Sequence, residues 1–285
     1  MNKKLKKKIV NKYLSVLSAV FILSIFILFF IIFTTYKNGF KKTLVGNIAE
    51  EFSNIIEMQN KVHSIGDDIV MLENETHSGL LEATSEQIDL MEDVIEESTS
   101  NLEWLEARED NKDDKLRQLI IETKTYYEDV ITTYTDYADQ KEYINALNYT
   151  VFTYNEKIAN LSKQDSENSP ETQDSKDKEI VFSEDEEFIQ VYEETYELLK
   201  NINPPENQKQ NHEKLLKEFE DISNMENFYQ IFFNYNEQIV AQINNSLALI
   251  DDLNKKAKDV KKRIIEFQTK YKLEPITIDI NEWKS

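Results

Sequence analysis

The chain has 285 residues, no cysteine and a formal net charge of −21. Its first 42 residues contain nine lysines and no acidic residue. The remaining residues therefore carry 24 basic against 54 acidic side chains, a net charge of −30. A chain without cysteine has no disulfide, no thiolate metal site and no lipid attached through a cysteine, which excludes a bacterial lipoprotein anchor. Nucleic-acid binding depends on Lys and Arg that meet phosphates, so we expect no nucleic-acid partner for this acidic body.

The segment 13–36 contains no charged residue. As a helix it would be about 36 Å long, enough to cross a hydrocarbon core of about 30 Å. Its apolar run is longer than the roughly 7–15 residues usual in a cleaved signal peptide. Six lysines precede it within residues 1–12 and three follow it closely, and this bias places the N-terminus in the cytoplasm. The sequence therefore predicts a signal anchor that crosses the lipid bilayer once, with an extracytoplasmic body.

The pattern beyond the span predicts an all-α body, an elongated helical bundle or a coiled-coil-like structure. Its first helical segment covers residues 37–161, in which apolar residues recur at steps of three and four up to residue 72 and again over 80–108. The run 109–115 has no apolar side chain. We expect a turn there, with Asn111 or Asp113 as the N-cap of the next helix.

The helix predicted over 116–161 shows two rows of residues that recur every seven positions. One row is Leu116, Thr123, Val130, Tyr137, Ile144, Val151 and Ile158, and the other begins with Ile120, Tyr127 and Tyr134 and continues as Leu147, Tyr154 and Leu161. Recurrence at this period is typical of a long helix in a bundle or coiled coil. The next 17 residues, 162–178, contain no apolar side chain, so we expect them to form a disordered polar loop.

A second helical segment is predicted over residues 179–274. Its first helix begins with Ser183 as N-cap, in a capping box with Glu186, and stops before Pro204. A short amphipathic helix follows over 206–222, and seven-residue rows predict a long last helix over 225–271. Two polar residues of these rows, Asn236 and Ser246, are candidates for fixing the helix register.

The C-terminal tail, residues 275–285, alternates apolar and polar residues through Ile276, Ile278 and Ile280 and has Trp283 near its end. A period of two is typical of an extended strand. Such a strand could join the sheet edge of a partner protein. The other interpretation is a tail that lies along its own bundle.

The sequence shows no constellation typical of an enzyme. All four glycines precede residue 80, and neither a dinucleotide fingerprint nor a phosphate loop is present. The three histidines are too few and too widely spaced for a zinc site, and His212 is expected on the surface or rim of its helix. The acidic run 184–187 falls in a helix's first turn, where acids favour the dipole, so we interpret it as a cap rather than a calcium site. We predict no enzymatic activity, no cofactor and no bound metal.

Aromatic side chains are the remaining candidates for a site. Those of the two long helices that could line a ligand pocket or an interface are Tyr126, Tyr127, Tyr134, Tyr137, Tyr149, Tyr154, Tyr229 and Phe232. A tyrosine offers an apolar ring and a polar tip to a small molecule. The alternative is bundle packing, with the hydroxyls reaching the rim.

These observations favour a membrane-anchored, non-enzymatic protein of the cell envelope whose helical body acts as a scaffold or protein-interaction module, through a protein partner or self-association. A ligand-sensing or solute-binding body with a pocket between helices is the alternative. A third hypothesis is a scaffold of inverted topology that faces the cytoplasm. In outline the arrangement resembles the helical ectodomain of a chemoreceptor, without a second span or a transmitter, and this resemblance implies no signalling role.

Overall fold

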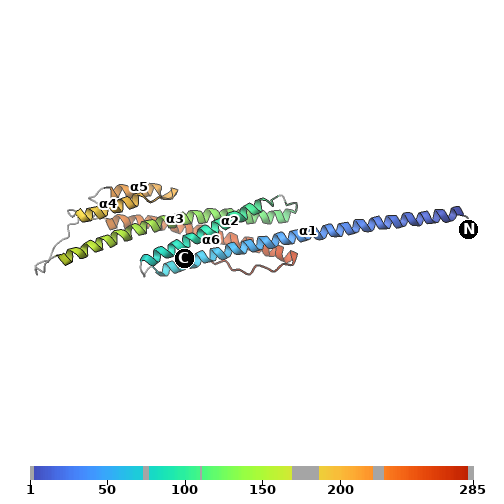
Figure 1. Cartoon of the computed structure of the whole chain (residues 1–285), viewed down its shortest axis with the longest axis horizontal. Coiled ribbons are helices and arrows are strands. Elements are labelled where there is room, and N and C mark those ends of the chain that lie inside the picture. Colours follow the sequence, from blue (N-terminus) through green and yellow to red (C-terminus); the bar gives the residue numbers. More distant parts are fainter. Residues whose placement is uncertain (1–2, 73–76, 110, 169–185, 221–227, 282–285) are drawn as a thin grey trace. The chain divides into compact units, whose positions relative to one another are not determined.

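A computed structural model describes residues 3–72, 77–109, 111–168, 186–220 and 228–281. For some helical residues it describes the backbone but not the side chains; these are 3–23, 67–72, 77–78, 80, 162–168, 228–229, 233 and 236–245. The described residues are helical apart from turns and the C-terminal tail, with no strand among them (Figure 1). The predicted all-α fold class is confirmed.

Six α-helices and one short 3-10 helix make up the described part of the chain. They are α1 (Lys3–Leu72), α2 (His77–Glu106), α3 (Asp114–Asn168), α4 (Glu186–Lys200), η1 (Glu206–Gln208), α5 (Lys209–Phe219) and α6 (Phe228–Tyr271). The order and type of the helices follow the prediction. Two predictions differ in their bounds: α3 continues seven residues into the predicted loop 162–178, and the helix predicted over 206–222 consists of η1 followed by α5, which ends at Phe219. Extending an existing helix is far easier than starting one, so a polar stretch can prolong it.

Several predictions fall on residues outside the description. These are the remainder of the loop, 169–178, the capping residue Ser183, the side chains of Tyr229 and Asn236, and Trp283.

The chain divides into two units, one formed by Met1–Ser53 with Lys261–Thr277 and the other by Asn54–Val260 with Ile278–Ser285. In the first unit, α1 buries apolar residues at steps of one, three and four, as one face of a helix requires. The buried side chains are Leu44, Val45, Ile48, Ala49 and Phe52 of α1, with Ile264 and Phe267 of α6.

No helix in the part of the chain whose residues are described is both long enough and apolar enough to cross a membrane. The predicted span 13–36 belongs only partly to that set, since the side chains of 13–23 are outside the description.

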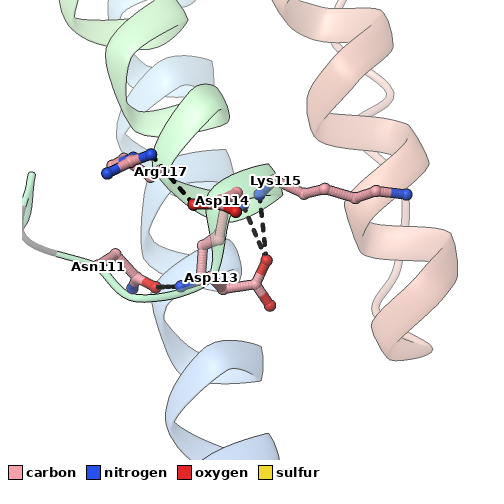
Figure 2. Close-up of polar contacts among 6 residues, drawn as sticks. Asn111, Asp113, Asp114, Lys115 and Arg117 are labelled. Atoms are coloured by element: carbon pink, nitrogen blue, oxygen red, sulfur yellow. Dashed lines mark hydrogen bonds and ion pairs between the residues drawn. The ribbon is translucent and has the colours of Figure 1, made fainter.

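In the second unit, α2 and α3 pack side by side as a hairpin, and its turn is fixed by local polar contacts (Figure 1). Figure 2 shows the carboxylate of Asp113 accepting hydrogen bonds from the backbone N–H groups of Lys115 and Leu116, at 3.2 and 3.3 Å. The side-chain oxygen of Asn111 accepts the Asp113 N–H at 3.0 Å. Asp113 is therefore the N-cap of α3, and Asn111 orders the chain before it.

The two predicted seven-residue rows of α3 differ in burial beyond Tyr137. The row residues from Leu116 to Tyr137 are buried, but Ile144, Val151 and Ile158 are only half-buried. Beyond Tyr137 the buried positions of α3 are Ala138, Gln140, Tyr143, Leu147, Thr150 and Tyr154. The second predicted row thus steps back by one residue between Tyr134 and Leu147, while Ile144, Val151 and Ile158 of the first row pack against the core as half-buried residues.

The shift has a physical reason at Lys141, which the unshifted row would place in the core. An unpaired buried ammonium is costly to desolvate. The shift leaves Lys141 half-buried, where desolvation still lowers its pKa and the Tyr137 ring lies 5.6 Å from its Nζ. Gln140 enters the core instead and accepts a hydrogen bond from Ser246 of α6 at 3.1 Å. Ser246 is thus paired across the seam, as expected of a register-fixing residue.

The C-terminal tail is extended and is held by side-chain amides. After α6, Lys272 has a positive φ of 56°, and the Leu273 N–H bonds back to the Gln268 carbonyl at 2.8 Å, a common way to end a helix. In the second unit, Asn60 of α1 donates to the Asp279 carbonyl at 2.8 Å and accepts the Asn281 N–H at 3.0 Å.

The first unit contains a similar clamp within itself. The Gln268 side chain donates to the Glu274 carbonyl at 2.6 Å and accepts the Ile276 N–H at 3.0 Å. In each clamp, one side-chain amide donates to the backbone carbonyl of a tail residue and accepts the backbone N–H of the residue two positions further on. The isoleucines of the tail, Ile276, Ile278 and Ile280, are half-buried and alternate with exposed residues.

Candidate functional site

Most of the aromatic side chains proposed for a pocket lie in the packed interior. Tyr127, Tyr134, Tyr137 and Tyr154 of α3 are all at most 6% exposed, and Phe232 of α6 is 8% exposed. The hydroxyl of Tyr134 meets Nε2 of His63 at 3.4 Å. None of these five lines the pocket described next.

A pocket of about 470 Å³ lies between α3 and the segment that runs from the end of α4 into the turn before η1. In Figure 1, α4 lies beside the second half of α3, and α5 packs against α4. The lining residues are Asp139, Glu142, Tyr143, Ala146, Tyr149 and Thr150 of α3, with Leu198, Asn201, Ile202, Asn203, Pro204 and Pro205. We call this the α3–α4 pocket.

The α3–α4 pocket has an acidic side and an apolar side. Its two charged lining residues are Asp139 and Glu142, and no Lys or Arg lines it. Desolvation by burial, followed by the charge of Asp136, raises the pKa of Asp139. Asp139 and Glu142 are both exposed, and a nearby cation would offset the repulsion between Asp139 and Asp136.

Beneath this pocket lies a buried polar cluster of three residues from three helices. The hydroxyl of Tyr143 hydrogen-bonds with Nδ1 of His212 at 2.9 Å and, through a short contact, with the hydroxyl of Tyr235. The rings of Tyr143 and His212 meet edge to face, with centroids 5.6 Å apart. His212 is 3% exposed, so the prediction of a surface or rim position was wrong. Tyr143 provides the partner of Nδ1, whereas the buried Nε2 has no hydrogen-bond partner among the described residues.

The cluster is suited to holding helices together rather than to proton transfer. Burial lowers the pKa of His212, an effect that the nearby backbone of Leu199 partly offsets, and burial also raises the pKa of Tyr143. Both shifts favour the neutral forms. With both side chains at most 3% exposed, a substrate outside has no direct path to the His212 ring. The cluster thus ties α3, α5 and α6 into one polar contact and supports one wall of the pocket.

Sequence reasoning missed this site because its parts are about sixty residues apart. Tyr149 was a candidate, but Asp139 and Glu142 were two acids among 54. One usable signal was present: Pro204 and Pro205 end a helix and fix a rigid corner next to apolar residues.

Among the residues whose placement is known, no three His, Asp or Glu side chains are grouped to hold a metal ion. The chain matches no protein-family model, no curated protein sequence and no solved structure.

Proposed function

We propose that the chain is a single-pass, membrane-anchored, non-enzymatic protein whose extracytoplasmic helical body binds another protein, as a scaffold or interaction module of the cell envelope. The observation that carries the anchor is a run of nine consecutive large apolar side chains in α1, Ile25 to Phe33, each 45–71% exposed. So large an apolar surface is unfavourable in water. It suits lipid, and the uncharged segment 13–36 that contains it has the length for a span.

The lysine bias supports the orientation. Residues 1–12 hold six lysines and the acidic body holds a net charge of −30. A basic flank is retained in the cytoplasm, which puts the body on the other side. The body would also be repelled by anionic headgroups and stand away from the lipid.

The interaction role is supported by the form of the body. Its long helices pack through apolar and tyrosine-rich seams, and the polar cores described above tie helices together rather than present reactive groups. Helical bodies of this kind commonly serve as binding surfaces.

The anchor is tested by two arginines placed in the span. Ile27→Arg with Phe30→Arg should release the protein from washed membranes, since each arginine near a helix centre costs about 3 kcal/mol on insertion. The control is Phe40→Arg, which alters an exposed apolar residue of α1 outside the predicted span and should stay membrane-bound. Equal retention of both variants would contradict the anchor.

The orientation and the partner need two further measurements. Protease added to intact protoplasts should digest the body without the membrane being opened. A body that is digested only after the membrane is opened would favour the inverted topology. Crosslinking in intact cells should then yield one defined partner or a homo-oligomer. A body that remains single would contradict the interaction role.

A second candidate function is ligand binding by the body. The α3–α4 pocket favours it, because about 470 Å³ with mixed polar and apolar walls is in the size range of small-molecule sites.

A further inference from the structure

We propose that the α3–α4 pocket binds the positively charged end of an organic cation, a primary amine or guanidinium group on an apolar body. The inference rests on the second candidate function and names the ligand class of that same pocket. It follows from three independent sources of negative potential around one cavity.

The first source is the pair of lining carboxylates. Asp139 and Glu142 lie on α3 at positions i and i+3, which places them on one side of the helix. Both side chains are exposed, and their cavity has no basic lining residue. A bound ammonium would supply the opposite charge to both carboxylates through charge-assisted hydrogen bonds.

The second source is the C-terminal end of α4. The helix ends at Lys200, and the next residues, 201–205, all line the cavity. A helix C-terminus carries a partial negative charge that favours cations. The one lysine of this last turn is directed elsewhere, because its Nζ pairs with Glu197 at 3.1 Å.

The third source is aromatic. Tyr149 lines the cavity and is 53% exposed, so its ring is accessible to a ligand. Tyr143 lines the inner wall while its hydroxyl is engaged with His212. The face of a tyrosine ring attracts ammonium and guanidinium groups.

The remaining lining selects an organic cation over a bare metal ion. Ala146, Leu198, Ile202 and the two prolines contribute apolar wall, which gives nothing to a metal that requires six or more oxygen ligands. A neighbouring hollow of about 420 Å³ shares Leu198 and Asn201 and is lined by Glu193, Glu194 and Glu197, with Lys157 paired to Glu194 at 2.5 Å. Its acids extend the negative potential along the outer side of α4.

The test uses the full chain in detergent micelles and three probes of one shape that differ in charge: phenethylamine, 2-phenylethanol and phenylacetate. Titration calorimetry and ligand-observed NMR should show binding of phenethylamine, at least about tenfold weaker binding of the alcohol, and none of the acid. Binding of phenethylamine should weaken as sodium chloride is raised.

Variants then locate the site. Asp139→Asn with Glu142→Gln should weaken phenethylamine binding about tenfold or more, and Tyr149→Leu should weaken it severalfold. The matched control is Glu156→Gln, an exposed acid of the same helix outside the cavity, which should bind like the parent. Helical circular dichroism checks that each variant folds.

Each contrary result has its own meaning. If phenylacetate or 2-phenylethanol binds as tightly as phenethylamine, and Tyr149→Leu abolishes that binding, the cation assignment is overturned and the pocket remains a ligand site. No binding of any probe would overturn both the assignment and the second candidate function. An equal effect of Glu156→Gln and of the double variant would reduce the result to general charge attraction and overturn the site.

Discussion

Single buried polar groups explain much of how this body is held in one arrangement. The Tyr143 hydroxyl serves two partners at once, Nδ1 of His212 and the hydroxyl of Tyr235, inside an otherwise apolar cluster. Removing that one oxygen leaves two buried polar groups to find other partners. The cost of such orphaned groups exceeds the worth of the bonds themselves.

We therefore expect Tyr143→Phe to lower the free energy of unfolding by about 1–3 kcal/mol. Tyr149→Phe removes a hydroxyl from a half-exposed ring on the same helix and should change stability by less than about 0.5 kcal/mol. Urea unfolding followed by circular dichroism measures both. Equal effects would show that the buried hydroxyl has no special role.

The second residue-scale prediction concerns acid stability. Burial lowers the pKa of His63 to about 4, with the Asn281 backbone partly offsetting this. Between pH 6.5 and 4 the unfolded chain binds a proton at this histidine and the folded chain does not, so stability falls as the pH falls. The full loss is about 3 kcal/mol.

The 54 acidic residues also titrate in this range. The effect of His63 must therefore be measured as the difference in unfolding free energy between the parent and a variant without this histidine. His63→Gln cannot titrate, and the gap in unfolding free energy between parent and variant should narrow as the pH falls from 6.5 to 4. A gap that stays constant would mean that His63 is as easily protonated in the folded chain as in the unfolded one.

At the scale of elements, the start of α3 depends on a cap whose two neighbouring acids have different roles. Asp113 accepts backbone N–H groups of the first turn, while Asp114 pairs with Arg117 at 3.1 Å in an exposed position. Caps contribute more than exposed ion pairs. We expect Asp113→Ala to cost about 1 kcal/mol and Asp114→Ala less than about 0.5 kcal/mol. Thermal unfolding of the two variants distinguishes them, and Asp113→Asn should recover most of the loss.

The helices were predictable because their apolar residues repeat at helical steps, and the turn at Asn111 and Asp113 was predictable because its side chains act locally. The one-residue shift of the second row after Tyr134 is visible in the sequence, but the hydrogen bond that Gln140 accepts from Ser246 of α6 is not. The buried position of His212 and the α3–α4 pocket were hidden for the same reason. Their partners come from distant parts of the chain, and no local pattern marks them.

The tail is held by hydrogen bonds from side-chain amides of the helices. Asn60→Ala removes both hydrogen bonds to residues 279 and 281. Hydrogen exchange at the Asn281 amide should become about fivefold faster or more, because opening no longer breaks those bonds. Asn160→Ala, an exposed amide of α3, should leave that rate unchanged. An unchanged rate in Asn60→Ala would mean that Asn60 does not control this amide and that other contacts of Asn281, such as the hydrogen bond from Asn254 to its carbonyl at 3.1 Å, hold it instead.

On the scale of the whole molecule, repulsion among the excess negative charges opposes the attraction within ion pairs. The chain past residue 42 carries a net charge of −30. Its ion pairs are mostly on the surface; those of Lys61 with Glu57 and Lys255 with Asp252 leave 59–75% of each side chain exposed. Exposed pairs contribute little, whereas excess charge of one sign destabilises a folded chain.

Repulsion should therefore dominate the salt response. Raising sodium chloride from about 10 to 100 mM shortens the screening length from about 30 to 10 Å, and we expect the Tm to rise by a few degrees. A falling Tm would mean that the ion pairs outweigh the repulsion. The variant with Asp139→Asn and Glu142→Gln separates a local effect from a global one. It should show nearly the same rise, because two charges are a small part of the excess, and a lost rise would trace the response to the α3–α4 pocket.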